Sequence, residues 1–394
     1  MSVAIPAEDP RHLPNRVRVD PSAITHNTRA IRARLEEHTA LMAVVKADGY
    51  GHGMLAAARA ALDGGATWLG VAHPASALAL SRAGFDVPIL TWLFEPSTAA
   101  DVLPAVIDAG IDVSIGSAEM LRLVSTAARS VDRRARVHLK IDSGLGRGGA
   151  LPYQVRPLGA ALREDDFLHP VGAWSHLAAA DDPEDPFTDQ QVGVFDSAVE
   201  ELVEETGPIP LQHLANTAAA LSRPDLHRDL VRVGIGMYGY PPLPIGGPTP
   251  LRPALTLTTH VAMVKDVTAG QTSGYGHTWT APEATRLGLL PIGYADGIHR
   301  AASGRARVMV RTRSGDEIAP QVGRISMDQI VVDLGARSAA RPGDEVIVFG
   351  EADDAVLTGG EQLPTAEDWA RAADTIPYEV LTSISSRVPR EVLP

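Results

Sequence analysis

The sequence predicts an α/β protein, with an N-terminal (β/α)8 barrel followed by a mostly antiparallel β domain. Two observations carry this prediction. Eight short apolar runs lie between residues 41 and 236, separated by alanine-rich stretches long enough for crossover helices. After Tyr240, a Pro/Gly-rich connector leads into turn-punctuated runs that are typical of antiparallel strands.

The eight apolar runs are the candidate strands of the barrel. Helix-like segments such as 54–65 and 74–84 lie between them, and several close on glycine, a common helix stop. An open doubly wound sheet is the alternative, because periodicity alone does not separate closed from open parallel sheets. The count of eight favours the barrel. The candidate strands are 41–45, 67–72, 87–92, 111–115, 136–141, 170–177, 211–215 and 231–236.

The expected domain boundaries follow from these patterns. We expect a loose tail over 1–14, the barrel over 15–245, and the β-rich domain over 246–394. The alternating run at 15–20 precedes the barrel pattern and is a candidate edge strand of the β-rich domain.

Composition excludes several classes of protein. The net charge of -13, from 35 basic and 48 acidic residues, argues against a nucleic-acid or anionic-membrane surface. The absence of cysteine excludes disulfides, thiolate metal sites and cysteine nucleophiles, and no other metal-ligand motif is present. No apolar stretch is long enough to span a bilayer, and the N-terminus lacks the pattern of a signal peptide. We therefore expect a cytoplasmic protein.

A lysine ends the first candidate strand, in the stretch AVVKADGYGHG. Lys46 alone could be a solvated strand end. Three glycines follow it, however, and allow a ligand to approach the backbone, while Tyr50 offers a hydroxyl. A buried lysine has a lowered pKa, as a Schiff-base amine requires. We therefore expect Lys46 to be buried and chemically active.

Polar residues also end the later strands, where barrel enzymes place their active sites. GIG, at residues 234–236, is a plausible phosphate cradle but lacks the spacing of a dinucleotide site. Together with Lys46 it indicates pyridoxal phosphate, a phosphate-bearing aldehyde. The polar strand-end residues are Lys140, Arg147, His176, Asn216, Thr217 and Arg232.

These motifs together resemble the alanine racemases, which are fold-type III pyridoxal-phosphate enzymes. The resemblance runs from about Arg16 to the C-terminus. It rests on AVVKADGYGHG, LKIDSGLGRGG, SHLAAAD, HLANTAA, RVGIGMYG, SGYGHTW, PIGYADG, GRISMDQ and IPYEV, in the family's order.

The resemblance implies a role for each site residue. Lys46 would hold the cofactor, and Arg232 would face its pyridine nitrogen. The phosphate would be bound by Tyr50, Thr217, Gly234, Ile235 and Tyr378, and Asn216 would also bind the cofactor. The substrate would meet Arg147, Tyr294 and Met327, the last through its backbone amide. Tyr275, Tyr294 and Met327 would come from the partner subunit of a homodimer, and Lys140 would be a candidate carbamylated lysine.

Racemisation needs a proton carrier on each face of the α-carbon. Lys46 and Tyr275 are the expected pair. Because tyrosine normally titrates near pH ~10, Tyr275 needs tuning, and we expect His176 and Arg232 to supply it as nearby cations. The expected product is D-alanine for peptidoglycan.

Three other functions are the alternatives. Gly148 stands where the family often has a larger residue, which leaves room for a broader amino-acid or serine racemase. A fold-type III decarboxylase fits poorly, because RVGIGMYG and the barrel-first order favour a racemase. A non-catalytic pyridoxal-phosphate carrier does not explain the β-rich domain and its Tyr275 motif.

Overall fold

The computed structural model describes residues 12–243, 251–351 and 362–394. Most of the expected tail and the expected boundary near residue 245 lie outside the described residues. The chain divides into two compact units, which we call the barrel unit (24–49 and 54–251) and the β unit (residues up to 23, 50–53 and 252–394). Among the described residues, no helix has the length and apolar character needed to cross a bilayer.

The barrel unit contains a parallel sheet of eight strands in the order β8-β7-β6-β5-β4-β3-β2-β9. Backbone hydrogen bonds join the two ends of this order. Asp229 N donates to Gln212 O at 3.2 Å, and Arg232 N donates to Ala215 O at 2.9 Å. The predicted barrel is confirmed, and each predicted strand is present. The strands are β2 (Ala40–Val44), β3 (Trp68–Val71), β4 (Ile89–Thr91), β5 (Asp112–Ile115), β6 (Ala135–Lys140), β7 (Leu168–Trp174), β8 (Leu211–His213) and β9 (Leu230–Val233).

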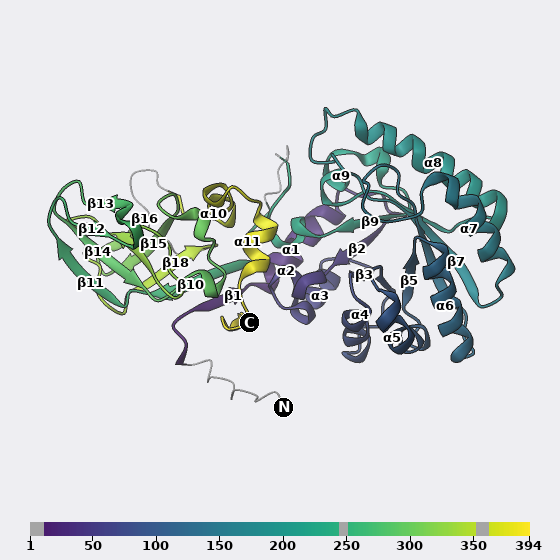
Figure 1. Cartoon of the computed structure of the whole chain (residues 1–394), viewed down its shortest axis with the longest axis horizontal. Helices are drawn as coiled ribbons and strands as arrows, with labels where there is room; N and C mark the ends of the chain where they lie inside the picture. Colours follow the sequence, from purple (N-terminus) through teal and green to yellow (C-terminus); the bar gives the residue numbers. More distant parts are fainter. Residues whose placement is uncertain (1–11, 244–250, 352–361) are drawn as a thin grey trace. The chain divides into compact units, whose positions relative to one another are not determined.

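Helices surround these strands on the outside, as Figure 1 shows for α3 to α8. Their amphipathic sequences explain this position. In α6 (Ala118–Ser130), for example, Leu121 and Val124 are buried, while Ser117 caps the helix by accepting from Met120 N at 3.2 Å. The other helices are α1 (Pro21–Arg32), α3 (Met54–Asp63), α4 (Pro74–Arg82), α5 (Pro96–Asp108), α7 (Pro152–Glu164), α8 (Phe187–Thr206) and α9 (Thr217–Ser222).

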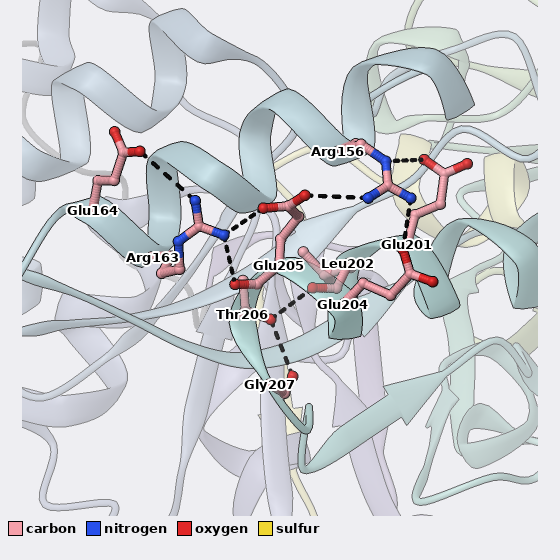
Figure 2. A network of polar contacts seen from close by, with 9 residues as sticks. All are labelled: Arg156, Arg163, Glu164, Glu201, Leu202, Glu204, Glu205, Thr206 and Gly207. Atoms are coloured by element: carbon pink, nitrogen blue, oxygen red, sulfur yellow. Dashed lines mark hydrogen bonds and ion pairs between the residues drawn. The ribbon is translucent and has the colours of Figure 1, made fainter.

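The outer faces of α7 and α8 are joined by an ion-pair network (Figure 2). Arg156 on α7 lies 2.7 Å from Glu204 and 3.2 Å from Glu205, both on α8. Arg163 on α7 lies 2.5 Å from the other carboxylate oxygen of Glu205. Glu205 therefore accepts from both arginines and holds the two helices in register.

The β unit is built on a nine-stranded sheet of order β11-β14-β17-β16-β15-β18-β10-β1-β19. The early strand β1 lies in this sheet, antiparallel to β10 and parallel to β19. The sequence did not predict β16, which contains Pro320, or the short β19, because neither shows an apolar run. The strands are β1 (Arg16–Val19), β10 (Leu255–His260), β11 (Met263–Val267), β14 (Thr285–Leu290), β15 (Arg307–Thr312), β16 (Gly315–Val322), β17 (Ile330–Asp333), β18 (Glu345–Phe349) and β19 (Arg390–Val392).

Candidate active site

Lys46 lies just beyond β2, at the start of the short turn α2 (Lys46–Tyr50). The turn is left-handed, with φ values of 53° at Ala47, 51° at Asp48 and 61° at Gly49. Residues with a side chain pay about 1–2 kcal/mol each for this conformation, a strain that functional sites often contain. We expected Lys46 to be buried; the residue as a whole is exposed, whereas surrounding protein atoms desolvate its amine.

The amine of Lys46 nevertheless sits in an electropositive setting. Desolvation by surrounding protein atoms, followed by the charges of Arg147 and Arg232, lowers the pKa of Lys46. The same three influences lower the pKa of Lys140 to about 8. Four basic side chains therefore act on one another in this part of the barrel unit, an arrangement suited to an anionic ligand and a reactive amine.

Arg232 is buried and held by main-chain carbonyl groups. Its Nη1 donates to His213 O at 2.8 Å, and its Nη2 donates to Ser175 O at 2.7 Å and Leu214 O at 3.0 Å. Burial lowers the pKa of Arg232 to about 9, which still leaves a cation at neutral pH. Because a guanidinium only donates hydrogen bonds, any ring nitrogen facing it must be an acceptor.

His176 lies beside Arg232, with its Nδ1 3.4 Å from Nη2 of the arginine. Burial, and then the charges of Arg232 and Arg147, lower the pKa of His176 to about 3. The expectation that His176 acts as a cation is therefore wrong, because neighbouring cations keep it neutral. Its Nδ1 faces a donor, so its proton is on Nε2, where it can be donated.

A small cradle forms where α9 begins and β9 ends. Gly234 N donates to Thr217 Oγ1 at 3.0 Å, which leaves the threonine hydroxyl free to donate to another acceptor. A Cβ atom on Gly236 would lie only 2.6 Å from Thr217 Cγ2, so glycine is needed there. Asn216 instead caps α9, its Oδ1 accepting from Ala219 N at 3.1 Å. Ile235, the first residue of η3 (Ile235–Tyr238), is buried beside this cradle.

The loop that carries Arg147 is fixed at its base. Asp142 Oδ1 accepts from Gly144 N at 3.1 Å and from Gly146 N at 3.0 Å. The Arg147 side chain is exposed, and its charge acts on Lys46, Lys140 and His176, so the loop presents a cation to the same region.

The remaining predicted residues lie in the β unit. The rings of Tyr50 and Tyr378 have centroids 6.0 Å apart, with Tyr378 on α11 (Pro377–Ser383). A Cβ on Gly51 would lie 2.6 Å from Leu381 O, so the 50–53 segment packs closely against this helix. Burial, together with Tyr378, raises the pKa of Tyr50, which keeps its hydroxyl a proton donor.

Tyr294 and Met327 are brought together although they are far apart in the sequence. Tyr294 N donates to Ser326 O, and Ala295 N donates to Met327 O, both at 3.0 Å. Tyr294 begins η5 (Tyr294–Asp296) and Tyr275 begins η4 (Tyr275–His277). Tyr275 is 69% exposed, Met327 54% and Tyr294 42%, so this unit presents three large side chains without covering them.

The barrel residues fit pyridoxal phosphate by their chemistry. They offer an amine of lowered pKa, a buried guanidinium donor, and a hydroxyl-and-glycine cradle for phosphate. Sequence reasoning assigned no role to Asp112, His138, Trp174 or His213. All four are buried inside the barrel. The one sequence signal that could have identified them is the alternation of polar residues with apolar residues along these strands, which places the polar side chains on one face.

Comparisons with known proteins identify the family of this chain. Residues 19–242 match the family described as alanine racemase, N-terminal domain, and residues 254–392 match alanine racemase, C-terminal domain. An alanine racemase from Thermobifida fusca is 46% identical over 377 residues, which cover 95% of this chain and 96% of that protein.

Solved structures show the same likeness. Alanine racemase from Streptomyces coelicolor A3(2) superposes with a TM-score of 0.89 at 44% identity, covering 97% of this chain and 98% of that one. Alanine racemase from Bacillus anthracis with bound L-Ala-P gives 0.83 at 31% identity, covering 97% and 96%. By these family, sequence and structure matches, the chain belongs to the alanine racemase family.

Proposed function

We propose that this chain interconverts L-alanine and D-alanine with pyridoxal phosphate as its cofactor. The observation that carries this proposal is Arg232, a buried guanidinium held by three carbonyl groups. The pyridine nitrogen of the cofactor would face this hydrogen-bond donor. A carboxylate in this place would favour a protonated ring and longer-lived charge at the α-carbon. A guanidinium favours rapid return of the proton, which suits racemisation.

The cofactor would be held at three points. Lys46 would hold it covalently, and Arg232 would donate to the pyridine nitrogen. Thr217 and the backbone amide of Ile235 would donate to the phosphate beside Gly234, whose own amide donates to Thr217. Tyr50 and Tyr378 would add phenolic donors to the phosphate, and Asn216 orders the cradle by capping α9. When bound, pyridoxal phosphate withdraws electrons from the amino acid and makes its Cα proton acidic.

Two side chains of this protein move the proton. One member of the pair, as the phenolate of Tyr275 or the neutral amine of Lys46, would accept the Cα proton from one face. The other, in its protonated form, would donate a proton to the opposite face, and the reverse reaction would exchange these roles. The lowered pKa of Lys46 makes its neutral amine available at neutral pH. His176, neutral and with its proton on Nε2, connects the tyrosine to Arg232 as a hydrogen-bond donor.

Arg147 and the Met327 amide would bind the substrate carboxylate, and Tyr294 would limit the side-chain space. We further propose that Lys140 is carbamylated. The carbamate, an anion, would then orient the cation Arg147.

A homodimer would complete the site. The exposed Tyr275, Tyr294 and Met327 of one subunit would enter the barrel of its partner, consistent with their exposure in the β unit. A cytoplasmic location and a role in supplying D-alanine for peptidoglycan are part of this proposal.

Incubation with L-alanine in D2O tests the function directly. We expect deuterium at Cα together with D-alanine, detected by NMR and chiral chromatography. Lys46→Ala should abolish both the visible absorbance of the loaded protein and turnover. Loss of CO2 would indicate a decarboxylase instead, and the absence of any exchange would rule out the proposal.

A further inference from the structure

A line of hydrogen-bonded polar side chains runs through the interior of the barrel. Asp112 on β5 lies 3.0 Å from His138 Nε2 on β6. His138 Nδ1 lies 3.0 Å from His213 Nε2 on β8, and His213 Nδ1 lies 3.2 Å from Nη1 of Arg232. Barrel interiors are normally filled by branched apolar side chains, so a polar line there calls for a reason.

The histidines on this line are entirely enclosed. His138 and His213 are both 0% exposed, and Asp112 is 1% exposed. A Cβ atom on Gly172 would lie 2.1 Å from His138 Nδ1, so the neighbouring strand keeps a glycine where the ring needs space. Trp174 stacks on His213 with ring centroids 5.6 Å apart and planes within 4°. The rings therefore have fixed positions.

The chemistry of the two ends sets the direction of every bond. Arg232 can only donate, so His213 Nδ1 must accept and its proton must be on Nε2. His213 then donates to His138 Nδ1, which leaves the proton of His138 on Nε2. That proton is donated to the carboxylate of Asp112. Burial, and then the charge of Arg232, lower the pKa of His213 well below its usual value, consistent with a neutral ring.

We propose that Asp112, His138 and His213 are positioning residues for the reaction, forming a one-way hydrogen-bond chain that fixes the tautomer of His213 and thereby the orientation of Arg232. The functional part of this inference rests on the proposed role of Arg232 toward the pyridine nitrogen. Asp112 is the anchor, because its carboxylate accepts and cannot donate. An uncharged amide in place of the Asp112 carboxylate could either donate or accept, so the direction of the hydrogen bonds would no longer be determined.

Arg136 makes the anchor sensitive to a single-atom change. Its Nε lies 2.6 Å from Asp112 Oδ1, and its Nη2 lies 3.2 Å from Oδ2. In Asp112→Asn the amide oxygen must face the shorter contact, which places the NH2 group toward His138. His138 and His213 then take the Nδ1–H form, and His213 presents a proton to Arg232.

The first test uses the protein without cofactor, so it does not depend on activity. Side-chain NMR of protein carrying ¹⁵N-labelled histidine reports which ring nitrogen bears the proton. His138→Gln and His213→Gln identify the two signals. We expect both histidines as Nε2–H tautomers in the native protein. An Nδ1–H form of His213 would overturn the proposal.

The second test uses Asp112→Asn and the double variant Asp112→Asn/Arg136→Met. The single variant should invert both tautomers. It should also lower kcat roughly tenfold, the effect of one lost hydrogen bond to a charged group, and change the absorbance of the bound cofactor. The double variant removes the Arg136 donors, so the amide oxygen can turn to His138 and restore tautomers and kcat.

Arg136→Met alone should keep the native tautomers. A merely structural role predicts instead that the double variant is no better than Asp112→Asn, and this result would refute the proposal. If native tautomers are found but no Cα exchange occurs in D2O, the chain of hydrogen bonds stands and the proposed function fails.

Discussion

At the scale of single residues, the small number of lysines makes the chemistry of each one easy to assign. The sequence contains three lysines, Lys46, Lys140 and Lys265. The charges of Arg147 and Arg232 lower the pKa values of Lys46 and Lys140, whereas Lys265 lies on β11 of the β unit.

We expect Lys140 to form a carbamate in bicarbonate. The neutral amine attacks the carbon of CO2, forming an N–C bond and releasing one proton. Because the pKa of Lys140 is lowered to about 8, the neutral fraction is substantial at pH 8 and falls as the pH drops below that value. ¹³C NMR in labelled bicarbonate should show a carbamate signal that weakens below pH 8.

Lys140→Ala is the control for this measurement and should remove the signal. A signal that persists in this variant, or none in the native protein, contradicts carbamylation of Lys140.

Arg232→Glu should change the kind of product as well as the rate. The glutamate would favour a protonated pyridine nitrogen, so charge at the α-carbon lives longer and proton return to other atoms competes. We expect the ratio of pyruvate formed to alanine racemised to rise about tenfold or more. Arg232→Lys, which keeps the positive charge, is the control. An unchanged ratio in a folded Arg232→Glu protein would contradict the assigned role of Arg232.

At the scale of elements, the cradle between α9 and β9 requires a glycine at position 236. In Gly236→Ala, the new Cβ would meet Thr217 Cγ2 at 2.6 Å and displace the hydroxyl that accepts from Gly234 N. We expect affinity for pyridoxal phosphate to fall roughly tenfold, as loss of about one charge-assisted hydrogen bond implies. Titration of the cofactor by absorbance measures this.

Gly193→Ala is the matched control, because Gly193 lies within α8 and a Cβ there meets nothing within 4 Å. Alanine should stabilise that helix by about 0.5–1 kcal/mol and leave cofactor affinity unchanged. Equal cofactor affinity in Gly236→Ala and the native protein would show that the cradle does not bind the phosphate.

The α7–α8 network gives a pH-dependent contribution to stability (Figure 2). Hydrogen bonds from Arg163, and then Arg156, lower the pKa of Glu205. A carboxylate with a lowered folded-state pKa stabilises the fold above its unfolded pKa of about 4.3, and this contribution is lost as the pH falls through the folded value. Glu205→Gln should therefore lower the melting temperature at pH 7 by on the order of 1–2 °C, and less below pH 4.

Glu164→Gln is the comparison variant for calorimetry, since Glu164 is exposed and lies 3.7 Å from Arg163. It should change the melting temperature less than Glu205→Gln does. The same shift for both variants at all pH values would assign no special role to Glu205.

At the scale of the whole molecule, the proposed dimer makes a quantitative prediction. Lys46 lies in the barrel unit and Tyr275 in the β unit. In the proposed dimer, each site would take Lys46 from one subunit and Tyr275 from the other. Lys46→Ala and Tyr275→Phe should each be inactive alone. Mixed after reversible dissociation, half of the dimers contain one of each, and each mixed dimer has one intact site of two. We expect about a quarter of native activity.

Co-expression of the two variants with different affinity tags and isolation of the mixed dimer makes this measurement direct. A mixed dimer without activity would show that each site is completed within one subunit.

The sequence by itself determined the strands of the barrel and the linear motifs of the site. Buried parallel strands are continuous apolar runs. The functional residues of the loops that follow them, such as Lys46 and Arg147, each lie within a short contiguous motif. It did not predict the polar strand β16, because the pairing of strands rather than an apolar run defines it.

Only the tertiary structure decided the charge states and the long-range partners. His176 is neutral because burial and four surrounding basic groups act on it together, and no local pattern records that sum. His138 and His213 are 75 residues apart, yet they share a hydrogen bond because β6 and β8 both face the barrel interior. Electrostatic and hydrogen-bond energies depend on distance in space, so sequence can name the groups, while the fold sets their pKa values and partners.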